Sequence, residues 1–433
     1  MLSATIVSAM LCGRRWRSAI SLALAVALWV SGADVIAAAG DGLLLQTGGR
    51  QFPIGFYELP EGDAELAAMA SAGVNLVRCG TRADLDRAQA VGIKAWMPLP
   101  LDQGATDDLK SRLESVLDHP ALAVWEGPDE MVWNYTAFSG LHKSGVYDKP
   151  REWWEQTPKT IAYSEAKAAE IIPKFKAAAE MIRSLDKQAR PIWMNEAQSS
   201  DVRLVRQYLP FVDITGCDAY PVSKEKRNAV SISGIVDRWR MTGNDMPVWM
   251  VLQAFSWHEL GEGYVDRGVA YPSFAESRFM AYASILHGAK GVLYWGSDHT
   301  TSEPLRKSVY AVTAELAALQ PFLVAPNEAG IAVRLVETPE ERAGIGVSVA
   351  VRRAGEDWLV MLLNEDDKKH MGVEITGLSA LDNRALVLLY GDEPAPVVNG
   401  ALVARIQPYE VKLYATSRAF ETAMREGRDY AGE

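Results

Sequence analysis

Two adjacent carboxylic acids, Asp129 and Glu130, follow a short apolar run and the Gly127-Pro128 break behind it. The run, Leu122–Trp125, is rich in branched and aromatic residues, as buried strands are. Proline cannot donate to a strand ladder, so the strand is predicted to end there. A (β/α)8 barrel keeps its catalytic groups just beyond the C-terminal ends of its strands. The alternative is that both acids cap a following helix, whose N-terminus favours negative charge.

Alternating strand-like and helix-like segments predict the scaffold that would position these acids. Eight such units favour a (β/α)8 TIM barrel over a doubly wound open sheet, because no glycine fingerprint follows the first strand. The expected strands are Gln51–Tyr57, Val74–Cys79, Ile93–Pro98, Leu122–Trp125, Pro191–Asn195, Val212–Cys217, Pro247–Leu252 and Gly291–Trp295. The expected helices are Asp63–Ala72, Ala83–Val91, Asp107–Leu117, Ala162–Leu185, Val202–Tyr208, Ile232–Met241, Phe274–His287 and Leu305–Leu319.

Two connections are long enough to be functional loops. They span residues 131–160 and 254–272, and both follow strand ends, so they are expected to project over one mouth of the barrel. Both are rich in aromatic residues, which suit the apolar faces of sugar rings. The alternative is that these rings only pack the loops together.

The pattern changes near Pro326, where short strand-like runs with turns replace the helical spacing. These runs predict a small C-terminal antiparallel β-sandwich. The expected divisions are a signal peptide at 1–39, a barrel of catalytic type at 40–323, the β domain at 324–416 and a charged tail at 417–433.

The N-terminal segment is typical of an export signal. Arg14, Arg15 and Arg17 precede an apolar segment, and the run of alanines at 37–39 offers a cleavage site. We therefore expect a periplasmic or extracellular protein without a membrane segment after cleavage; a retained N-terminal anchor is the alternative. A net charge of −11 argues against nucleic acid as a partner.

Cysteine and histidine usage predicts no disulfide, metal site or cofactor. Cys79 and Cys217 both fall in expected strands and are interpreted as buried thiols. The six histidines are scattered, with no Cys/His cluster at metal-ligand spacing, and the sequence has no glycine-rich phosphate loop.

Four short motifs occur in a familiar order along the chain. They are His119-Pro-Ala-Leu ahead of Asp129-Glu130, Asp218-Ala-Tyr220-Pro221, Pro247-Val-Trp249, and His287-Gly-Ala ahead of Tyr294-Trp295. In this order they resemble glycoside hydrolases of the large (β/α)8 clan that contains β-galactosidases and cellulases, without pointing to a single family. The resemblance implies an oligosaccharide or polysaccharide substrate.

The resemblance assigns the general acid/base role to Glu130. Asp129 would raise the proton affinity of Glu130 by like-charge repulsion, or orient a substrate group. The chain departs from the clan at the seventh strand, where Gln253 stands in place of the nucleophilic glutamate. An amide cannot take up the glycosyl group, so the retaining double displacement is in doubt.

Three explanations remain open. In the first, another ionised group acts, with Asp218 the first candidate, followed by Glu196, Glu259 and Asp298. Alternatively, Asp129 and Glu130 resemble the pair of hexosaminidases, in which the acetamido oxygen of the substrate is the nucleophile. In the third explanation the barrel binds sugar without cleaving it. The expected substrate-binding residues are Trp133, Glu196, Tyr220, Gln253, Trp257, Trp295 and Asp298, with Glu58 and Arg78 as weaker candidates.

Overall fold

The computed structural model describes residues 41–46, 49–136, 147, 151–244, 246–337 and 346–432. The expected signal peptide lies outside these residues. Among the described residues, no helix is both long enough and apolar enough to cross a membrane.

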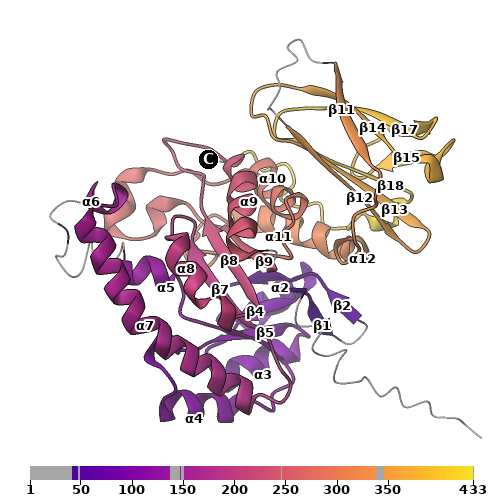
Figure 1. Cartoon of the computed structure of the whole chain (residues 1–433). Helices are drawn as coiled ribbons and strands as arrows, with labels where there is room; N and C mark the ends of the chain where they lie inside the picture. Colours follow the sequence, from indigo (N-terminus) through magenta and orange to yellow (C-terminus); the bar gives the residue numbers. More distant parts are fainter. Residues whose placement is uncertain are drawn as a thin grey trace, which may run out of the picture.

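Eight parallel strands close into a barrel, which confirms the expected fold (Figure 1). The closed order is β3, β4, β5, β6, β7, β8, β9 and β10, so each strand pairs with its neighbour in the chain and β10 returns to β3. The strands are β3 (Ile54–Phe56), β4 (Leu76–Arg78), β5 (Lys94–Pro98), β6 (Leu122–Glu126), β7 (Ile192–Ala197), β8 (Ile214–Ala219), β9 (Val248–Gln253) and β10 (Gly291–Trp295).

Helices surround the barrel as the alternating pattern predicts. The main ones are α2 (Asp63–Ser71), α3 (Arg82–Ala90), α4 (Asp107–Val116), α7 (Pro158–Leu185), α8 (Val202–Tyr208), α9 (Ser231–Gly243), α10 (Phe274–Leu286) and α11 (Glu303–Ala318). Three short helices, α5 (Met131–Trp133), α6 (Arg151–Trp154) and α12 (Gln320–Leu323), lie in the connections.

Tryptophan side chains fill the barrel interior. Trp96, Trp193 and Trp249 are fully buried, and their rings meet at centroid distances of 5.5 Å and 5.2 Å. Gly291 leaves room for the indole of Trp249, because a Cβ atom there would collide with that ring, and a Cβ atom at Gly216 would collide with the backbone carbonyl of Trp249. A small hairpin of β1 (Leu44–Gln46) and β2 (Gly49–Gln51), which the sequence did not predict, precedes the barrel. The carbonyl of Gly42, beside it, accepts a 2.9 Å hydrogen bond from the indole of Trp249.

The C-terminal domain is an eight-stranded antiparallel sheet with a sandwich-like core. Its strands are β11 (Ala332–Glu337), β12 (Val347–Ala354), β13 (Asp357–Asn364), β14 (Met371–Thr376), β15 (Ala385–Leu388), β16 (Pro394–Val398), β17 (Ala401–Ile406) and β18 (Val411–Ala415). Strand-like runs in the sequence occur at Gly330–Val336, Ile345–Arg352, Trp358–Asn364, Gly372–Ile375, Ala385–Tyr390 and Val411–Ala415, so β16 and β17 were not predicted. Their alternation of buried and exposed residues is clear in the structure, but the prolines at 394 and 396 are typical of turns.

The C-terminal tail packs against both domains. Arg278 on α10 and Arg428 in the tail both pair with the fully buried Glu315 of α11, at 2.7 Å each. Arg278 also donates to the carbonyl of Val411 in the β domain. Arg428 further lies 3.6 Å from the ring centroid of Tyr390. The charged tail is therefore part of the folded structure.

A histidine joins the barrel to the β domain. His287, just after α10, contacts Asp237 of α9 at 3.0 Å through Nδ1 and Glu365, which follows β13, at 3.0 Å through Nε2. Burial lowers the pKa of His287, but the two carboxylates outweigh it, so the pKa lies above its ordinary value. The charged imidazolium is thus favoured in the folded protein.

The first prediction concerns this histidine. A pKa raised on folding gives stability that is fully present below the unfolded value near 6.5 and is lost as pH rises through the folded value. We expect His287→Gln to lower the free energy of unfolding by about 1 kcal/mol more at pH 5.5 than at pH 8.5, the scale of a partly screened ion pair. Urea unfolding of both proteins at both pH values measures this difference. An equal or larger loss at pH 8.5 would contradict it.

Candidate active site

The chain bends sharply where the fourth barrel strand ends. Glu126 closes β6, and Gly127 is required behind it because a Cβ atom there would collide with Met194. Glu130 has a φ of 47°, a left-handed conformation that is uncommon for a residue other than glycine. Its amide donates a 3.1 Å hydrogen bond to the carbonyl of Asn195 on β7. Such conformations persist where the surroundings hold them, often at functional sites.

Neither acid of the pair uses its side chain to cap the following helix. Glu130 stands at the N-cap position of α5 without a side-chain cap hydrogen bond. The carboxylate of Asp129 is instead bound by side chains of the neighbouring strands. The capping explanation therefore does not account for these two acids.

Glu130 and Asp218 form a hydrogen-bonded carboxyl pair. Asp218 lies near the C-terminal end of β8 and is only 8% exposed. Burial and the neighbouring charge of Glu130 raise the pKa of Asp218 well above its ordinary value, and burial also raises the pKa of Glu130. Two carboxyl groups in such a contact hold one proton between them, because both cannot ionise at low cost. The hydroxyl of Tyr220 lies 3.3 Å from the Asp218 carboxyl.

Asp129 is held by donors from two other strands. Its Oδ1 accepts a 2.9 Å hydrogen bond from the Asn195 amide and lies 3.4 Å from the hydroxyl of Tyr57, which follows β3. Burial raises the pKa of Asp129, while the bonds from Asn195 and Tyr57 and the charge of Arg78 oppose that shift. Asn195 and Tyr57 thus fix the orientation of this carboxyl group, while burial keeps its pKa above the ordinary value.

Glu126 adds a fourth acid that the sequence analysis did not select. Its side chain is fully buried, and its Oε2 accepts a 2.8 Å hydrogen bond from the guanidinium of Arg78 at the end of β4. Burial raises the pKa of Glu126 to about 7 despite that partner. The sequence feature that could have identified Glu126 is a charged residue at the end of an otherwise apolar strand, because burying a charge without a partner is costly.

Aromatic rings lie beside the carboxyl cluster. Tyr220 stacks on Trp295 at a centroid distance of 5.3 Å, and Trp257 meets Tyr220 edge-on at 6.1 Å. These three expected sugar-binding residues come from β8, β10 and the loop after β9, so the fold brings them together.

Gln253 ends β9 next to Trp295 in the sheet register. Its side chain is fully buried, and it exchanges hydrogen bonds of 3.0 Å and 2.9 Å with the backbone of Val222 and donates another to the carbonyl of Phe255. The amide thus fastens the end of β9 to the segment after β8. These bonds are those of a structural group. A glutamate carboxylate in this place would face the carbonyl oxygens of Val222 and Phe255, which accept hydrogen bonds and cannot donate to it.

Glu196 on β7 has no exposed surface. Its oxygens accept hydrogen bonds from the amides of Val132 and Trp133, from Ser200 and from Tyr208. This carboxyl group therefore anchors α5, which directly follows Glu130, to the barrel. Burial raises its pKa to about 7.

The second prediction follows from this anchor. Glu196→Ala should lower the free energy of unfolding by about 3–5 kcal/mol, because it leaves several buried donors unpaired. Chemical denaturation measures the loss. A loss below about 1 kcal/mol, combined with weakened sugar binding, would instead favour the substrate contact expected from the sequence.

The remaining sequence candidates lie farther from the pair or within other contacts. Trp133 packs against Trp153 at 5.1 Å in the long connection after β6. Asp298 lies beside His299, 3.6 Å away, and lines a cavity next to Trp295. Glu259 is bound by Tyr271 and Thr301, and His119 by Asp86 and the amide of Ala121.

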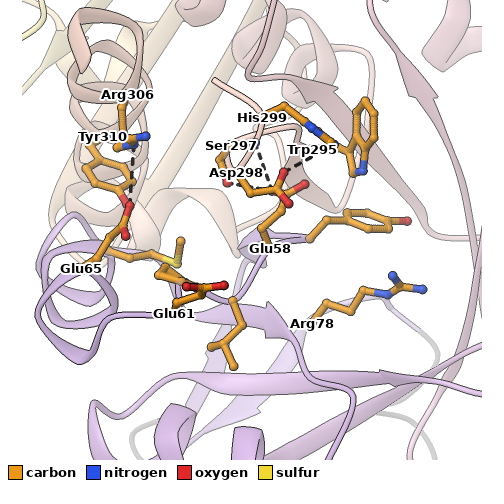
Figure 2. A pocket seen from close by; sticks show the side chains of 14 residues that line it. Glu58, Glu61, Glu65, Arg78, Trp295, Ser297, Asp298, His299, Arg306 and Tyr310 are labelled. Carbon is orange, nitrogen blue, oxygen red and sulfur yellow. Dashed lines mark hydrogen bonds and ion pairs between the residues drawn. The ribbon is translucent and has the colours of Figure 1, made fainter. Parts of the chain in front are cut away.

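A cavity of about 720 Å³ opens between the ends of β3 and β10 (Figure 2). Arg78 and Trp295 lie on one side of it, and Arg306 and Tyr310 lie opposite. Tyr57 and Arg78 contact Asp129 and Glu126 of the carboxyl cluster, and Tyr57 also lines the cavity. Glu58, another sequence candidate, lines it and accepts hydrogen bonds of 2.7 Å from the amide of Gly296 and from the hydroxyl of Ser297. No group of three or more histidine, cysteine, aspartate or glutamate side chains suited to a metal ion occurs among the described residues. Cys79 and Cys217 are buried free thiols.

Comparison with known proteins supports the fold. No family model matches the chain, and no curated protein matches its sequence. The β-galactosidase from Bacillus circulans sp. alkalophilus matches with a TM-score of 0.52 and 9% identity, over 85% of this chain and 99% of that one. A protein described as a glycoside hydrolase matches with a TM-score of 0.50 and 13% identity, over 87% of this chain and 97% of that one. A β-galactosidase from the psychrophilic Marinomonas ef1 is matched over only 60% of its length, at a TM-score of 0.42 and 13% identity.

Proposed function

We propose that this protein hydrolyses glycosidic bonds at the C-terminal mouth of its barrel. The observation that carries the proposal is the hydrogen-bonded pair of Glu130 and Asp218, which holds a proton among strand ends with stacked aromatic rings beside it. Glycoside hydrolysis needs a protonated carboxyl group at the leaving oxygen and an ionised one nearby. The barrel is shared with glycoside hydrolases, which supports this reaction class.

In this proposal Glu130 delivers the proton. Asp218 is the more buried of the two acids and stores the proton, which passes along their hydrogen bond when Glu130 protonates the leaving group. A direct hydrogen bond is closer than the ~5–5.5 Å of an acid and a nucleophile or the ~6.5–9.5 Å of an acid and a base. In this proposal Asp218 therefore supplies the proton to Glu130. It is not the second carboxylate, because a nucleophile or base must stand farther from the acid.

Asp129 is the best supported ionised partner. Asn195 and Tyr57 hold it, and with Arg78 they oppose the rise in its pKa that burial causes. There it can stabilise positive charge that develops on the sugar, or position an acetamido group if the substrate carries one.

The second candidate is a carbohydrate-binding barrel without turnover. The buried, backbone-bound Gln253 favours it, because the strand that carries the nucleophile in the clan offers no carboxylate here. A broad panel of glycans incubated with wild-type protein separates the two functions. Release of reducing ends supports hydrolysis, whereas binding without any release supports the second candidate.

Export is also a proposal, since the basic and apolar N-terminal segment is typical of a signal. N-terminal sequencing of the protein from cell fractions tests it: a mature chain that begins near residue 40 is expected, and an intact N-terminus would contradict it.

A further inference from the structure

Cavities continue around the C-terminal mouth beyond the one in Figure 2. A second cavity, of about 390 Å³, lies past the ends of β8 and β9 and has Tyr220 and Trp257 among its lining residues. A third, of about 580 Å³, lies between α6 and the start of α8, where Trp153 and Trp154 line it. Gln198, just after β7, lines both the second and the third cavity, so these two adjoin.

The carboxyl cluster lies between the first cavity and the other two. Tyr57 lines the first cavity and lies 3.4 Å from Asp129. Tyr220 lines the second and lies 3.3 Å from Asp218. Trp295 of the first cavity stacks on Tyr220, so the first and second cavities also adjoin. Because β7 stands four places from β3 in the closed order of eight strands, the third cavity lies across the mouth from the first.

Trp154 offers an open aromatic surface to the third cavity. It is 60% exposed, although Trp153 meets it edge-on at 4.6 Å and Trp133 lies 6.2 Å away. No other tryptophan in the described part of the chain is exposed to this extent, and tryptophan is a residue that folding mostly buries. The ring therefore remains free to stack on a ligand.

Hydrogen bonds hold the short helix α6 in place beside this cavity. Gln156, which follows α6, has a φ of 51°, a left-handed conformation that persists where its surroundings hold it. Its side chain donates a 2.7 Å hydrogen bond to the carbonyl of Trp153 and accepts one of 3.1 Å from Arg203 on α8. Arg203 also pairs with Asp201 at 2.6 Å. The position of the Trp154 ring is thus fixed before any ligand binds.

Polar groups without a partner of their own lie between the aromatic rings. Gln198, Ser199 and Asn228 line the second and third cavities, and their side chains make no hydrogen bond with any other described residue. Carboxamide and hydroxyl groups both donate and accept hydrogen bonds, as sugar hydroxyls do. Aromatic faces alternating with such groups suit a chain of sugar rings.

From this arrangement we infer that the substrate is a glycan chain of several sugars, bound across the mouth with a distal sugar on Trp154. One cavity of about 300–1,000 Å³ holds a small ligand, and three such cavities adjoin here. Since they flank the acid pair on both sides, the bond that is cleaved lies inside the chain, which makes the hydrolysis endo-acting. The inference deepens the proposed hydrolase activity and rests on it.

The first test measures where chains are cut. Soluble β-glucan, xylan, galactan, mannan and starch, with their oligosaccharides of two to six units, are incubated with the full-length protein. We expect viscosity to fall before much reducing sugar appears, and products of mixed length. Calorimetric affinity should rise about tenfold or more from two units to six, because further rings gain contacts. Release of single sugars from chain ends alone would overturn the inference.

The second test assigns the distal contact. Trp154→Ala should weaken binding of the six-unit chain about three- to tenfold, the scale of an aromatic contact, and raise its KM without changing kcat. Binding of the two-unit chain should not change. Gln198→Ala should weaken six-unit binding about two- to fivefold through a lost hydrogen bond. Met241→Ala is the matched control, since Met241 is 70% exposed on α9 and lines none of the three cavities. Circular dichroism confirms that all variants are folded.

The outcomes keep this inference apart from the proposed function. Cleavage that is confined to short glycans or chain ends, and that Trp154→Ala does not affect, would leave hydrolysis standing and remove the extended site. Chain-length-dependent binding that Trp154→Ala weakens, without any cleavage, would support the site and refute hydrolysis. An equal loss on two-unit and six-unit chains, or no binding of any polysaccharide, would overturn the inference.

Discussion

Glu130→Gln should lower kcat/KM on the glycoside substrate by about 10²–10⁴-fold, the usual contribution of a general acid. The amide keeps the shape and a hydrogen bond to Asp218 but cannot deliver a proton. Affinity for the sugar should change little, because the role of Glu130 lies in the transition state. Steady-state kinetics and calorimetric binding on the same glycan measure both effects.

An activated aryl glycoside is the control for this variant. Its leaving group needs little protonation, so the loss on Glu130→Gln should be much smaller for the aryl glycoside than for the natural linkage. An equal loss on both substrates would show that the substitution disrupts the site instead of removing an acid. A variant that retains full activity on the natural linkage would refute the role of Glu130.

Asp218→Asn should also lower activity at neutral pH, by about tenfold or more, through a change in the pH profile. The pair then no longer holds a shared proton, and the new amide donates to the Glu130 carboxylate. That hydrogen bond favours the ionised form of Glu130 and lowers its pKa. Because Glu130 must be protonated to act, activity is lost as pH rises through that pKa, so the basic limb of kcat/KM should move to lower pH.

The pH profile distinguishes this role from a structural one. If Asp218 only supported the fold, Asp218→Asn would lower kcat/KM by the same factor at every pH, and the pH at which activity is lost would not change. If Asp218 were the nucleophile, activity would be lost at every pH and the aryl glycoside would not recover it.

Because Gln253 stands where the clan has its nucleophile, the sequence left open which ionised group takes part in the reaction. The arrangement of the carboxyl groups narrows this choice. Asp218 lies too close to Glu130 for a spaced nucleophile or base. Glu196 is enclosed by four donors, and Glu259 is bound by Tyr271 and Thr301. Asp129 thus remains the ionised partner in the proposed mechanism. It adjoins Glu130, the proposed acid, in the sequence, yet the left-handed turn at Glu130 and the bond from Asn195 give the two side chains different surroundings.

Much of the scaffold could be predicted from the sequence because its signals are local. Short apolar runs between amphipathic segments placed all eight barrel strands to within a few residues, and Gly291–Trp295 and Val202–Tyr208 match their elements fully. The same pattern placed Glu130, Asp218 and Trp295 at strand ends on one mouth. Parallel strands in a closed barrel must bring such ends together whatever their separation along the chain.

The roles of individual acids could not be predicted this way. Glu196 and Glu126 both end or nearly end a buried strand, and both are fully buried, yet Glu196 meets four donors and Glu126 retains an unpaired oxygen. What separates them is which neighbouring elements supply N–H and O–H groups, and those elements are distant in sequence.

The sequence by itself determined the barrel, the β domain and several of the groups at the mouth, because strand and helix periodicity depends on residues near one another in the chain. Only the tertiary structure decided that Asp218 lies against Glu130, that Gln253 fastens the backbone and that Arg78 pairs with Glu126. These relations depend on contacts between groups that are distant in sequence, such as the 2.8 Å bond from Arg78 to Glu126 and the 3.0 Å bond from the amide of Val222 to Gln253. The proton affinity of a carboxyl group depends on its burial and on neighbouring charge, and both are fixed only when the barrel closes.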